Sequence, residues 1–193
     1  MRVIGGEFRS RRLKSLPGLK LRPTPDRLRE TIFDILGARI RGAVFLDAYA
    51  GSGAVGIEAL SRGAARAVFL EKHRRAVAVI RENLAALGLE ARAEVVHGEA
   101  LKRLGELHAD IVFLDPPYDL ERDCHAALRL LAASPPALVV VQHSTRAPLD
   151  DACGPLRRVR LRRQGDNALS FFEPTGGAGS QPAAGSPAGR GAR

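Results

Sequence analysis

The sequence predicts an α/β fold in which a mostly parallel sheet carries a ligand site at one edge. Three observations lead to this prediction. From residue 43 onward, short apolar runs alternate with stretches of helical periodicity. The stretch Gly51-Ser52-Gly53 follows the first apolar run, where sheets of this kind hold nucleotide-like ligands. A later apolar run ends in Asp115-Pro116-Pro117-Tyr118, a rigid polar turn expected at the same edge.

Residues 1–41 are predicted to form a small N-terminal extension. Weak alternation around Gly5-Gly6 indicates a hairpin over residues 1–13 with an exposed ribbon. A helix is expected to begin near Pro25, with Thr24 as its N-cap, and to end at Gly37. The ribbon would carry Arg2, Arg9, Arg11 and Arg12, and the polar face of the helix would carry Arg27, Glu30 and Asp34.

Residues 42–173 are predicted to form the core. Strands are expected near 43–47, 67–71, 93–97, 110–115 and 137–143, and helices near 53–63, 74–87, 99–107 and 121–133. Two further runs, 156–163 and 168–173, are separated by a turn and predict an antiparallel hairpin that closes the sheet. The tail, residues 174–193, has the Gly, Ala, Pro and Ser composition that is typical of disorder.

The composition argues against several classes of protein. A chain of 193 residues with 45% apolar content suits one main domain and an appendage. It has no apolar run near the roughly 20 residues of a membrane span, and its start lacks the apolar core of a signal peptide. Two cysteines, Cys124 and Cys153, are too few for a zinc site or a disulfide framework. We therefore expect a cytoplasmic monomer with no metal and no membrane contact.

The net charge of +9 is unevenly distributed. Residues 1–41 carry eleven Lys and Arg against four Asp and Glu, whereas residues 42–120 carry nine against eleven. Because the basic surplus is localised, we favour a nucleic-acid partner over a merely solubilising surface. The second interpretation stays open, since arginine outnumbers lysine 26 to 4. A further basic run, Arg157 to Arg163, could contact phosphate or protect an edge strand.

The glycine loop alone does not identify its ligand. Residues 51–56 satisfy G-x-G-x-x-G, which by itself predicts a dinucleotide. Asp47 ends the strand before the loop and would repel a pyrophosphate, but it would attract the ammonium and sulfonium of S-adenosylmethionine. Glu71, at the next strand end, can accept the ribose hydroxyls of either cofactor. Glu99, after the third strand, is placed to accept from an adenine amino group.

The Asp-Pro-Pro-Tyr turn fits the chemistry of an exocyclic amine. Such an amine is a poor nucleophile because its lone pair is delocalised into the ring. A carboxylate oxygen of Asp115 and the carbonyl of Pro116 could each accept one N–H, so that the lone pair faces an electrophile. Tyr118 could stack on the extruded base. The alternative for the isolated tetrapeptide is a rigid turn with a half-buried tyrosine.

The sequence resembles the RsmD-type 16S ribosomal RNA guanine-N2 methyltransferases over residues 1–173. The resemblance rests on four stretches, 2–6, 22–30, 47–64 and 115–118. It implies a class I S-adenosylmethionine-dependent methyltransferase fold, Rossmann-like, with a seven-stranded sheet. It also implies a guanine of 16S rRNA as the target, within an assembled or assembling 30S subunit, and S-adenosylhomocysteine as the product. The resemblance further suggests that Thr24, Arg27 and Glu30 help to close the site. Glu99 departs from the shorter polar residue expected there.

The candidate residues fall into three groups. The catalytic group is Asp115, Pro116, Pro117 and Tyr118. The cofactor-binding group is Thr24, Arg27, Asp47, Ala48, Tyr49, Ala50, Gly51, Ser52, Gly53, Glu71, Lys72, Glu99 and Ala100. The RNA-binding group is Arg9, Arg11, Arg12, Arg22, Arg27 and Glu30.

Four rival functions share part of this pattern. A DNA amino-methyltransferase would use the same tetrapeptide, but the chain has no room for a separate target-recognition domain. A protein glutamine methyltransferase needs no basic arm. A nicotinamide oxidoreductase would leave Asp47 and the tetrapeptide unexplained, and a non-catalytic RNA-binding assembly factor would not depend on Asp115.

Overall fold

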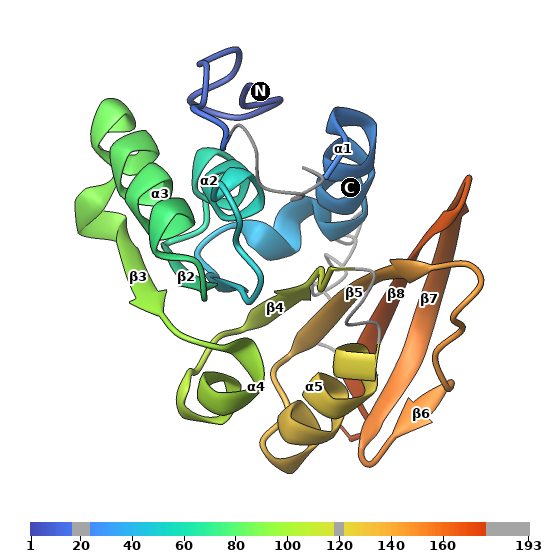
Figure 1. Ribbon diagram of the computed structural model, residues 1–193. Helices are drawn as coiled ribbons and strands as arrows, with labels where there is room; N and C mark the ends of the chain where they lie inside the picture. Colours follow the sequence, from blue (N-terminus) through green and yellow to red (C-terminus); the bar gives the residue numbers. More distant parts are fainter. Residues whose placement is uncertain (17–23, 118–121, 177–193) are drawn as a thin grey trace, which may run out of the picture.

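The computed structural model describes residues 1–16, 24–117 and 122–176 and contains one sheet of eight strands (Figure 1). The strands are β1 Val44–Asp47, β2 Arg66–Glu71, β3 Ala93–His97, β4 Ile111–Leu114, β5 Leu138–Ser144, β6 Ala152–Cys153, β7 Leu156–Gln164 and β8 Asn167–Pro174. Their order across the sheet is β3-β2-β1-β4-β5-β8-β7-β6. The five strands β1 to β5 are parallel, and β8 pairs antiparallel with β5. The predicted fold class is therefore confirmed, with the two-residue β6 as an addition at the edge.

Helices cover both faces of the sheet (Figure 1). They are α1 Asp26–Leu36, α2 Ala54–Ser61, α3 Arg74–Leu87, α4 Ala100–Arg103 and α5 Arg122–Ala133, with the short 3-10 helices η1 Gly37–Ile40, η2 Glu90–Arg92 and η3 Leu104–Glu106. Helices α1, α2 and α3 pack on one face, and α4 and α5 pack on the other. No helix in the described ranges is both long and apolar enough to span a membrane.

The strands alternate between these two cores, as a sheet covered on both faces requires. In β1, Phe45 faces the core under α1 to α3, and Leu46 faces the core under α4 and α5. Both side chains are fully buried. This explains why the core strands read as continuous apolar runs and could be located from sequence.

Two local predictions at the start of the chain need correction. Residues 1–13 do fold back on themselves, since Val3 donates its N–H to the Arg11 carbonyl and Leu13 donates to the Met1 carbonyl, each at 3.0 Å. The pairing amounts to an isolated bridge between Arg2 and Arg12 and not to a regular hairpin. Thr24 is not the N-cap of α1, since Pro25 takes that place and no side chain caps the helix. Helix 99–107 is also shorter than predicted, because α4 gives way to η3 at Leu104. The predicted disorder of the tail concerns residues that lie almost wholly outside the described ranges, although β8 continues to Pro174.

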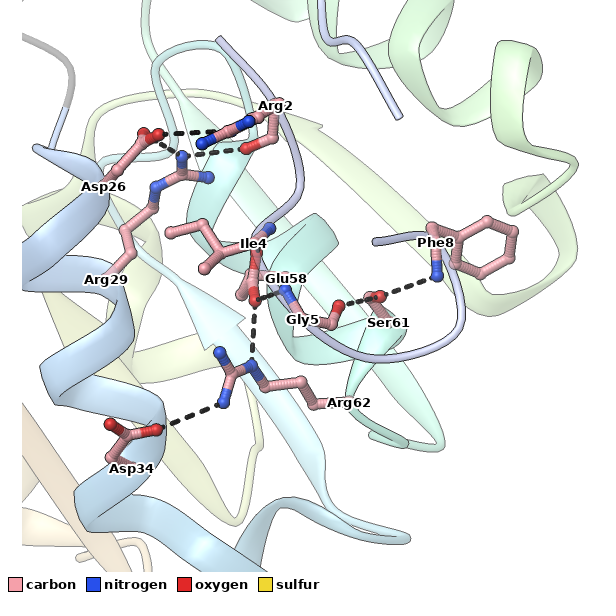
Figure 2. Close-up of polar contacts among 10 residues, drawn as sticks. All are labelled: Arg2, Ile4, Gly5, Phe8, Asp26, Arg29, Asp34, Glu58, Ser61 and Arg62. Atoms are coloured by element: carbon pink, nitrogen blue, oxygen red, sulfur yellow. Dashed lines mark hydrogen bonds and ion pairs between the residues drawn. The ribbon is translucent and has the colours of Figure 1, made fainter. Parts of the chain in front are cut away.

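Beyond this bridge, the N-terminal segment is held against α2. The fully buried carboxylate of Glu58 accepts the backbone N–H groups of Ile4 and Gly5, each at 2.8 Å (Figure 2). Ser61 donates to the carbonyl of Gly5 at 2.6 Å and accepts the N–H of Phe8 at 3.0 Å. The close approach explains Gly6, whose φ is +77° and whose Cβ would lie 1.9 Å from the Ser61 carbonyl oxygen.

Two arginines extend this connection to α1 (Figure 2). Arg29 is fully buried and donates to the Arg2 carbonyl at 2.9 Å and to Asp26 at 2.7 Å. Arg62 donates to Glu58 at 2.8 Å and lies 3.6 Å from Asp34 of α1. The N-terminal segment, α1 and α2 are thus held together by the buried carboxylate of Glu58 and by the two arginines.

Replacing Glu58 by alanine is expected to destabilise the protein by about 3–5 kcal/mol, because Arg62 and two backbone N–H groups lose a buried partner. Thermal unfolding monitored by circular dichroism would show a melting temperature lower by about 6–20 °C at a slope of about 2–4 °C per kcal/mol. Glu82→Ala is the matched control, since the exposed Glu82 forms a surface ion pair with Lys14 and its replacement should cost less than about 1 kcal/mol. Equal melting temperatures for the two variants would contradict this role of Glu58.

Candidate active site

A cavity of about 1130 Å³ lies at the carboxyl edge of the parallel strands. Its wall includes the ends of β1, β2, β4 and β5 and the start of β8. The cavity is larger than the roughly 300–1,000 Å³ of a typical small-molecule site, so it has room for two ligands or for one ligand and part of another. The glycine loop and the Asp115 turn both line it, as the sequence predicted.

Asp47 ends β1 and lies against the cavity with a side chain that is 1% exposed. Its Oδ2 accepts the backbone N–H of Gly56 at 3.0 Å, which ties the strand end to the first turn of α2. Burial raises the pKa of Asp47 to about 7, and the negative charges of Asp115 and Glu71 add to the rise. A cation bound beside Asp47 would favour the ionised carboxylate and would lower this pKa again.

The glycine loop contributes Gly51 and Ser52 to the cavity wall. Gly51 and Gly53 have φ values of +55° and +80°, a conformation that favours glycine. Glu71, at the end of β2, accepts the N–H of Gly51 at 2.8 Å and the N–H of His73 at 2.8 Å. Each carboxylate oxygen keeps a further lone pair. Gly56 serves packing, because a Cβ there would lie 2.3 Å from the ring of Phe69.

Asp115 follows β4 and lines the same cavity as Asp47. Thr24 donates its hydroxyl to Asp115 Oδ2 at 2.8 Å, across 91 residues of sequence. Desolvation raises the pKa of Asp115 to about 7, and the bond from Thr24 opposes that rise. Pro116 and Pro117 also line the cavity. Tyr118 lies outside the described residues, so its stacking role stays a prediction.

The remaining cofactor candidates divide into those at the cavity and those away from it. The cavity is lined by Thr24, Ala48, Tyr49, Ala50, Ser52, Lys72, Glu99 and Ala100. Burial raises the pKa of Tyr49 above its ordinary value. Glu99 is exposed and forms a 2.9 Å ion pair with Lys102, so an adenine contact would require it to leave that partner. Gly53 and Arg27 are not among the described lining residues, and Arg27 is exposed on α1.

The RNA-binding candidates are only partly free to meet a ligand. Arg9 and Arg12 are exposed, and so are Arg27 and Glu30. Arg11 donates to the Ala86 carbonyl at 3.3 Å and is thereby drawn toward α3. Arg22 lies outside the described residues.

The structure adds cavity residues that the sequence reasoning missed. They are Gln142 and His143 at the end of β5, Asn167 at the start of β8, and Asp123 of α5. Gln142 is 9% exposed, and its Oε1 has no hydrogen-bond partner within the described ranges. The signal was present in part, because the predicted strand 137–143 places Gln142 at its carboxyl end. Only the strand order shows that β5 lies beside β4.

The lining fits a cationic ligand better than a pyrophosphate. Of the residues that the structure describes, five with carboxyl side chains line the cavity: Asp47, Glu71, Glu99, Asp115 and Asp123. At close range these charges favour the ammonium and sulfonium of S-adenosylmethionine and oppose the phosphates of a dinucleotide. Among the described residues, no group of three or more His, Cys, Asp or Glu side chains could hold a metal ion.

The raised pKa of Asp47 makes the stability of the ligand-free protein depend on pH. The carboxyl ionises near 3.8 in its ordinary state and near 7 in the folded chain, so the wild type loses stability as the pH rises from about 4 to 7. Asp47→Asn removes this titration. The melting temperature of Asp47→Asn minus that of the wild type should therefore grow by about 5 °C or more between pH 4 and pH 7 and then level off. A difference independent of pH would contradict the buried ionisation.

Comparison with known proteins gives relatives that match most of the chain. The family model described as conserved hypothetical protein 95 matches residues 1–173. The YlbH protein of Bacillus subtilis is 33% identical over 91% of this chain and 100% of its own length. Ribosomal RNA small subunit methyltransferase D of Haemophilus influenzae is 37% identical over 77% of this chain and 81% of its own length.

Solved structures agree with this assignment. The Escherichia coli protein yhhF superposes with a TM-score of 0.79 at 32% identity, covering 90% of this chain and 97% of that one. At 21% identity, an RNA methyltransferase from Salinibacter ruber, solved with S-adenosyl-L-homocysteine, shares the fold with a TM-score of 0.62 over 80% of this chain and 95% of its own. The chain has a methyltransferase fold and belongs to the ribosomal RNA small subunit methyltransferase D family.

Proposed function

We propose that this protein transfers a methyl group from S-adenosylmethionine to the exocyclic N2 of a guanine in 16S rRNA. The single observation that carries the proposal is the placement of Asp115 and Asp47 in one cavity, each with a pKa raised to about 7. One carboxyl would face the amine that reacts, and the other would face the cationic cofactor. The family membership supports rRNA as the substrate class.

The cofactor would be held by residues around the glycine loop. Asp47 would attract its positive charge, Glu71 would accept from its ribose hydroxyls, and the glycines would allow its close approach to the backbone. When bound, S-adenosylmethionine supplies an electrophilic methyl group. Glu99 and Ala100 would lie at the adenine end, with Glu99 first released from Lys102.

The amine would be held by the Asp115 turn. Asp115 and the Pro116 carbonyl would accept its two N–H groups, and Thr24 would keep the carboxylate in place through its 2.8 Å bond. The methyl group would pass to the amine nitrogen as its bond to sulfur breaks, which would leave S-adenosylhomocysteine. The methylated nitrogen would then lose its extra proton to Asp115 or to solvent. Catalysis is thus mainly positioning and electrostatic stabilisation.

The partner and setting follow from the same proposal. Residues 1–41 would face the RNA, within an assembled or assembling 30S subunit, and the protein would act as a cytoplasmic monomer. The N-terminal segment would serve as part of a fixed surface, since Glu58 and Ser61 hold its backbone against α2. A DNA amino-methyltransferase is the nearest alternative, because the same turn would hold an adenine or cytosine amine.

A panel of substrates tests the proposal. The protein would be incubated with methyl-labelled S-adenosylmethionine and, separately, with 30S subunits from cells lacking the modification, stripped 16S rRNA, duplex DNA and a glutamine-bearing protein substrate. We expect label in 16S rRNA, presented either in 30S subunits or as stripped RNA, and little label in DNA or in the protein substrate. Label confined to DNA or to protein would overturn the choice of substrate. Cofactor binding without transfer to any of them, together with normal rRNA modification in cells carrying Asp115→Ala, would favour a non-catalytic assembly factor.

A further inference from the structure

Strand β7 presents a row of arginines to solvent. Arg160, Arg162 and Arg163 are exposed. The neighbouring apolar residues Val159 and Leu161 are also 55% and 39% exposed. Arg160 and Arg162 form no ion pair with any residue in the described ranges. The outer edge of β7 pairs with β6 only at Leu156 and Arg157. The strand therefore carries uncompensated positive charge over its second half.

The register of the sheet shows which face these charges occupy. Arg160 lies opposite Phe171 of β8, and Arg162 lies opposite Leu169. Residues directly opposite each other in an antiparallel pair share a face. Phe171 and Leu169 belong to the core under α1, so Arg160 and Arg162 flank α1 on the same face of the sheet.

Helix α1 contributes a third arginine to this face. Thr31 Oγ1 lies 3.5 Å from Gln164 Oε1, which brings the helix next to the end of β7. Thr31 also donates to the carbonyl of Arg27, one helical turn earlier. Because residues four apart share one side of a helix, exposed Arg27 lies along the side that meets β7. We call Arg27, Arg160 and Arg162 the α1–β7 arginine group.

The α1–β7 arginine group is next to the candidate active site. Asn167 lines the cavity and pairs with Gln164, two residues beyond Arg162. Asp115 directly follows β4, and the path from β4 to β7 crosses β5 and β8, which is three strand spacings, or about 14 Å. That separation suits phosphates that flank a nucleotide whose base reaches Asp115.

The acids around this surface do not cancel its charge. Glu173 of β8 pairs with Arg39, and Asp34 of α1 lies beside Arg62. Glu30 on α1 and Asp166 in the β7–β8 turn are exposed and have no ion pair within the described ranges, so two acids stand against the three arginines of the group. The surface therefore stays net positive beside an acidic cavity, an arrangement in which phosphate is attracted at the rim and a cation inside.

We propose that the α1–β7 arginine group binds the phosphate backbone on either side of the target nucleotide and orients the RNA over the cavity. The proposal rests on the proposed function and deepens it by adding β7 to the RNA-binding surface. The competing explanation is that the β7 arginines only prevent edge-to-edge association of the sheet. The two explanations predict different results for the same variant.

The test is the double variant Arg160→Ala/Arg162→Ala, assayed for methyl transfer to 16S rRNA and for RNA binding by fluorescence anisotropy. Loss of two phosphate contacts should raise KM and the RNA Kd by about 5- to 20-fold at 0.1 M salt, with kcat and cofactor affinity unchanged. The slope of log K against log salt should fall by about 1.4–1.8. Arg160→Lys/Arg162→Lys should recover most of the affinity, because lysine still binds phosphate as a point charge.

The matched control is Arg66→Ala/Arg129→Ala, which removes two exposed arginines from the amino end of β2 and from α5. Equal effects of the two double variants, or an unchanged salt slope for the β7 variant, would overturn the proposal. So would a β7 variant that self-associates in light scattering yet binds RNA normally. A wild-type protein that does not bind rRNA would overturn the proposed function as well. If the wild type methylates rRNA and the β7 variant does so with the same KM and RNA Kd, only this inference is overturned.

Discussion

Replacing Asp115 by asparagine is expected to lower kcat for rRNA methylation by about 10²–10³-fold, the usual cost of losing one electrostatic contact to the reacting group. Asparagine keeps an acceptor oxygen for the amine but cannot bear the charge that stabilises the developing ammonium. With the amide nitrogen in the place of Oδ2, it would donate to the Thr24 hydroxyl, so the turn should keep its position. Steady-state kinetics would show KM for RNA and the cofactor Kd within about threefold of wild type.

The pH profile gives a second readout of the same carboxyl. With a pKa raised to about 7, the wild type should lose kcat/KM about tenfold per pH unit below that value, because protonation turns one acceptor oxygen of Asp115 into a donor. Asp150→Asn is the control for the lost charge, since Asp150 is exposed and outside the cavity lining. A kcat within threefold of wild type for Asp115→Asn would refute the role given to this turn.

Asp47→Asn is expected to weaken S-adenosylmethionine binding by about 100-fold, within the 2–5 kcal/mol cost of truncating a buried charge partner. The amide oxygen can still accept the N–H of Gly56, so the loop should persist and the loss should reflect charge. Calorimetric titration would measure it. In the wild type the affinity should rise with pH up to about 7, because Asp47 must ionise to meet the cation.

In Asp47→Asn the affinity for S-adenosylmethionine should rise much less with pH. A small rise can persist because Asp115 ionises in the same pH range. A neutral analogue of the cofactor gives the control, since it should bind the variant and the wild type with similar affinity. Unchanged affinity of the variant for S-adenosylmethionine, or tight binding of NAD by the wild type, would contradict the cofactor assignment.

The core could be predicted because its signals are local. The parallel strands β1, β2, β4 and β5 read as apolar runs, and the positive φ values at Gly51 and Gly53 favour glycine. Asp47, Glu71 and Asp115 follow strands of one parallel sheet, and the carboxyl ends of such strands meet at one edge. Their convergence on one cavity therefore followed from the sequence.

The N-terminal region could not be predicted in the same way, because distant residues decide it. Threonine is a common N-cap residue, yet the hydroxyl of Thr24 donates to Asp115, 91 residues away. The backbone of Ile4 is satisfied by Glu58, 54 residues away, where local alternation had predicted a hairpin partner. Gln142 and Asn167 enter the site only through the order of β4, β5 and β8.

The most direct test of the central claim is mass spectrometry of nucleosides from 16S rRNA treated with the protein and deuterated-methyl S-adenosylmethionine. The account predicts one labelled species, N2-methylguanosine, formed by the wild type and reduced about 100-fold or more in Asp115→Asn. Label on any other base or ring position, or equal labelling by the Asp115→Asn variant, would contradict it.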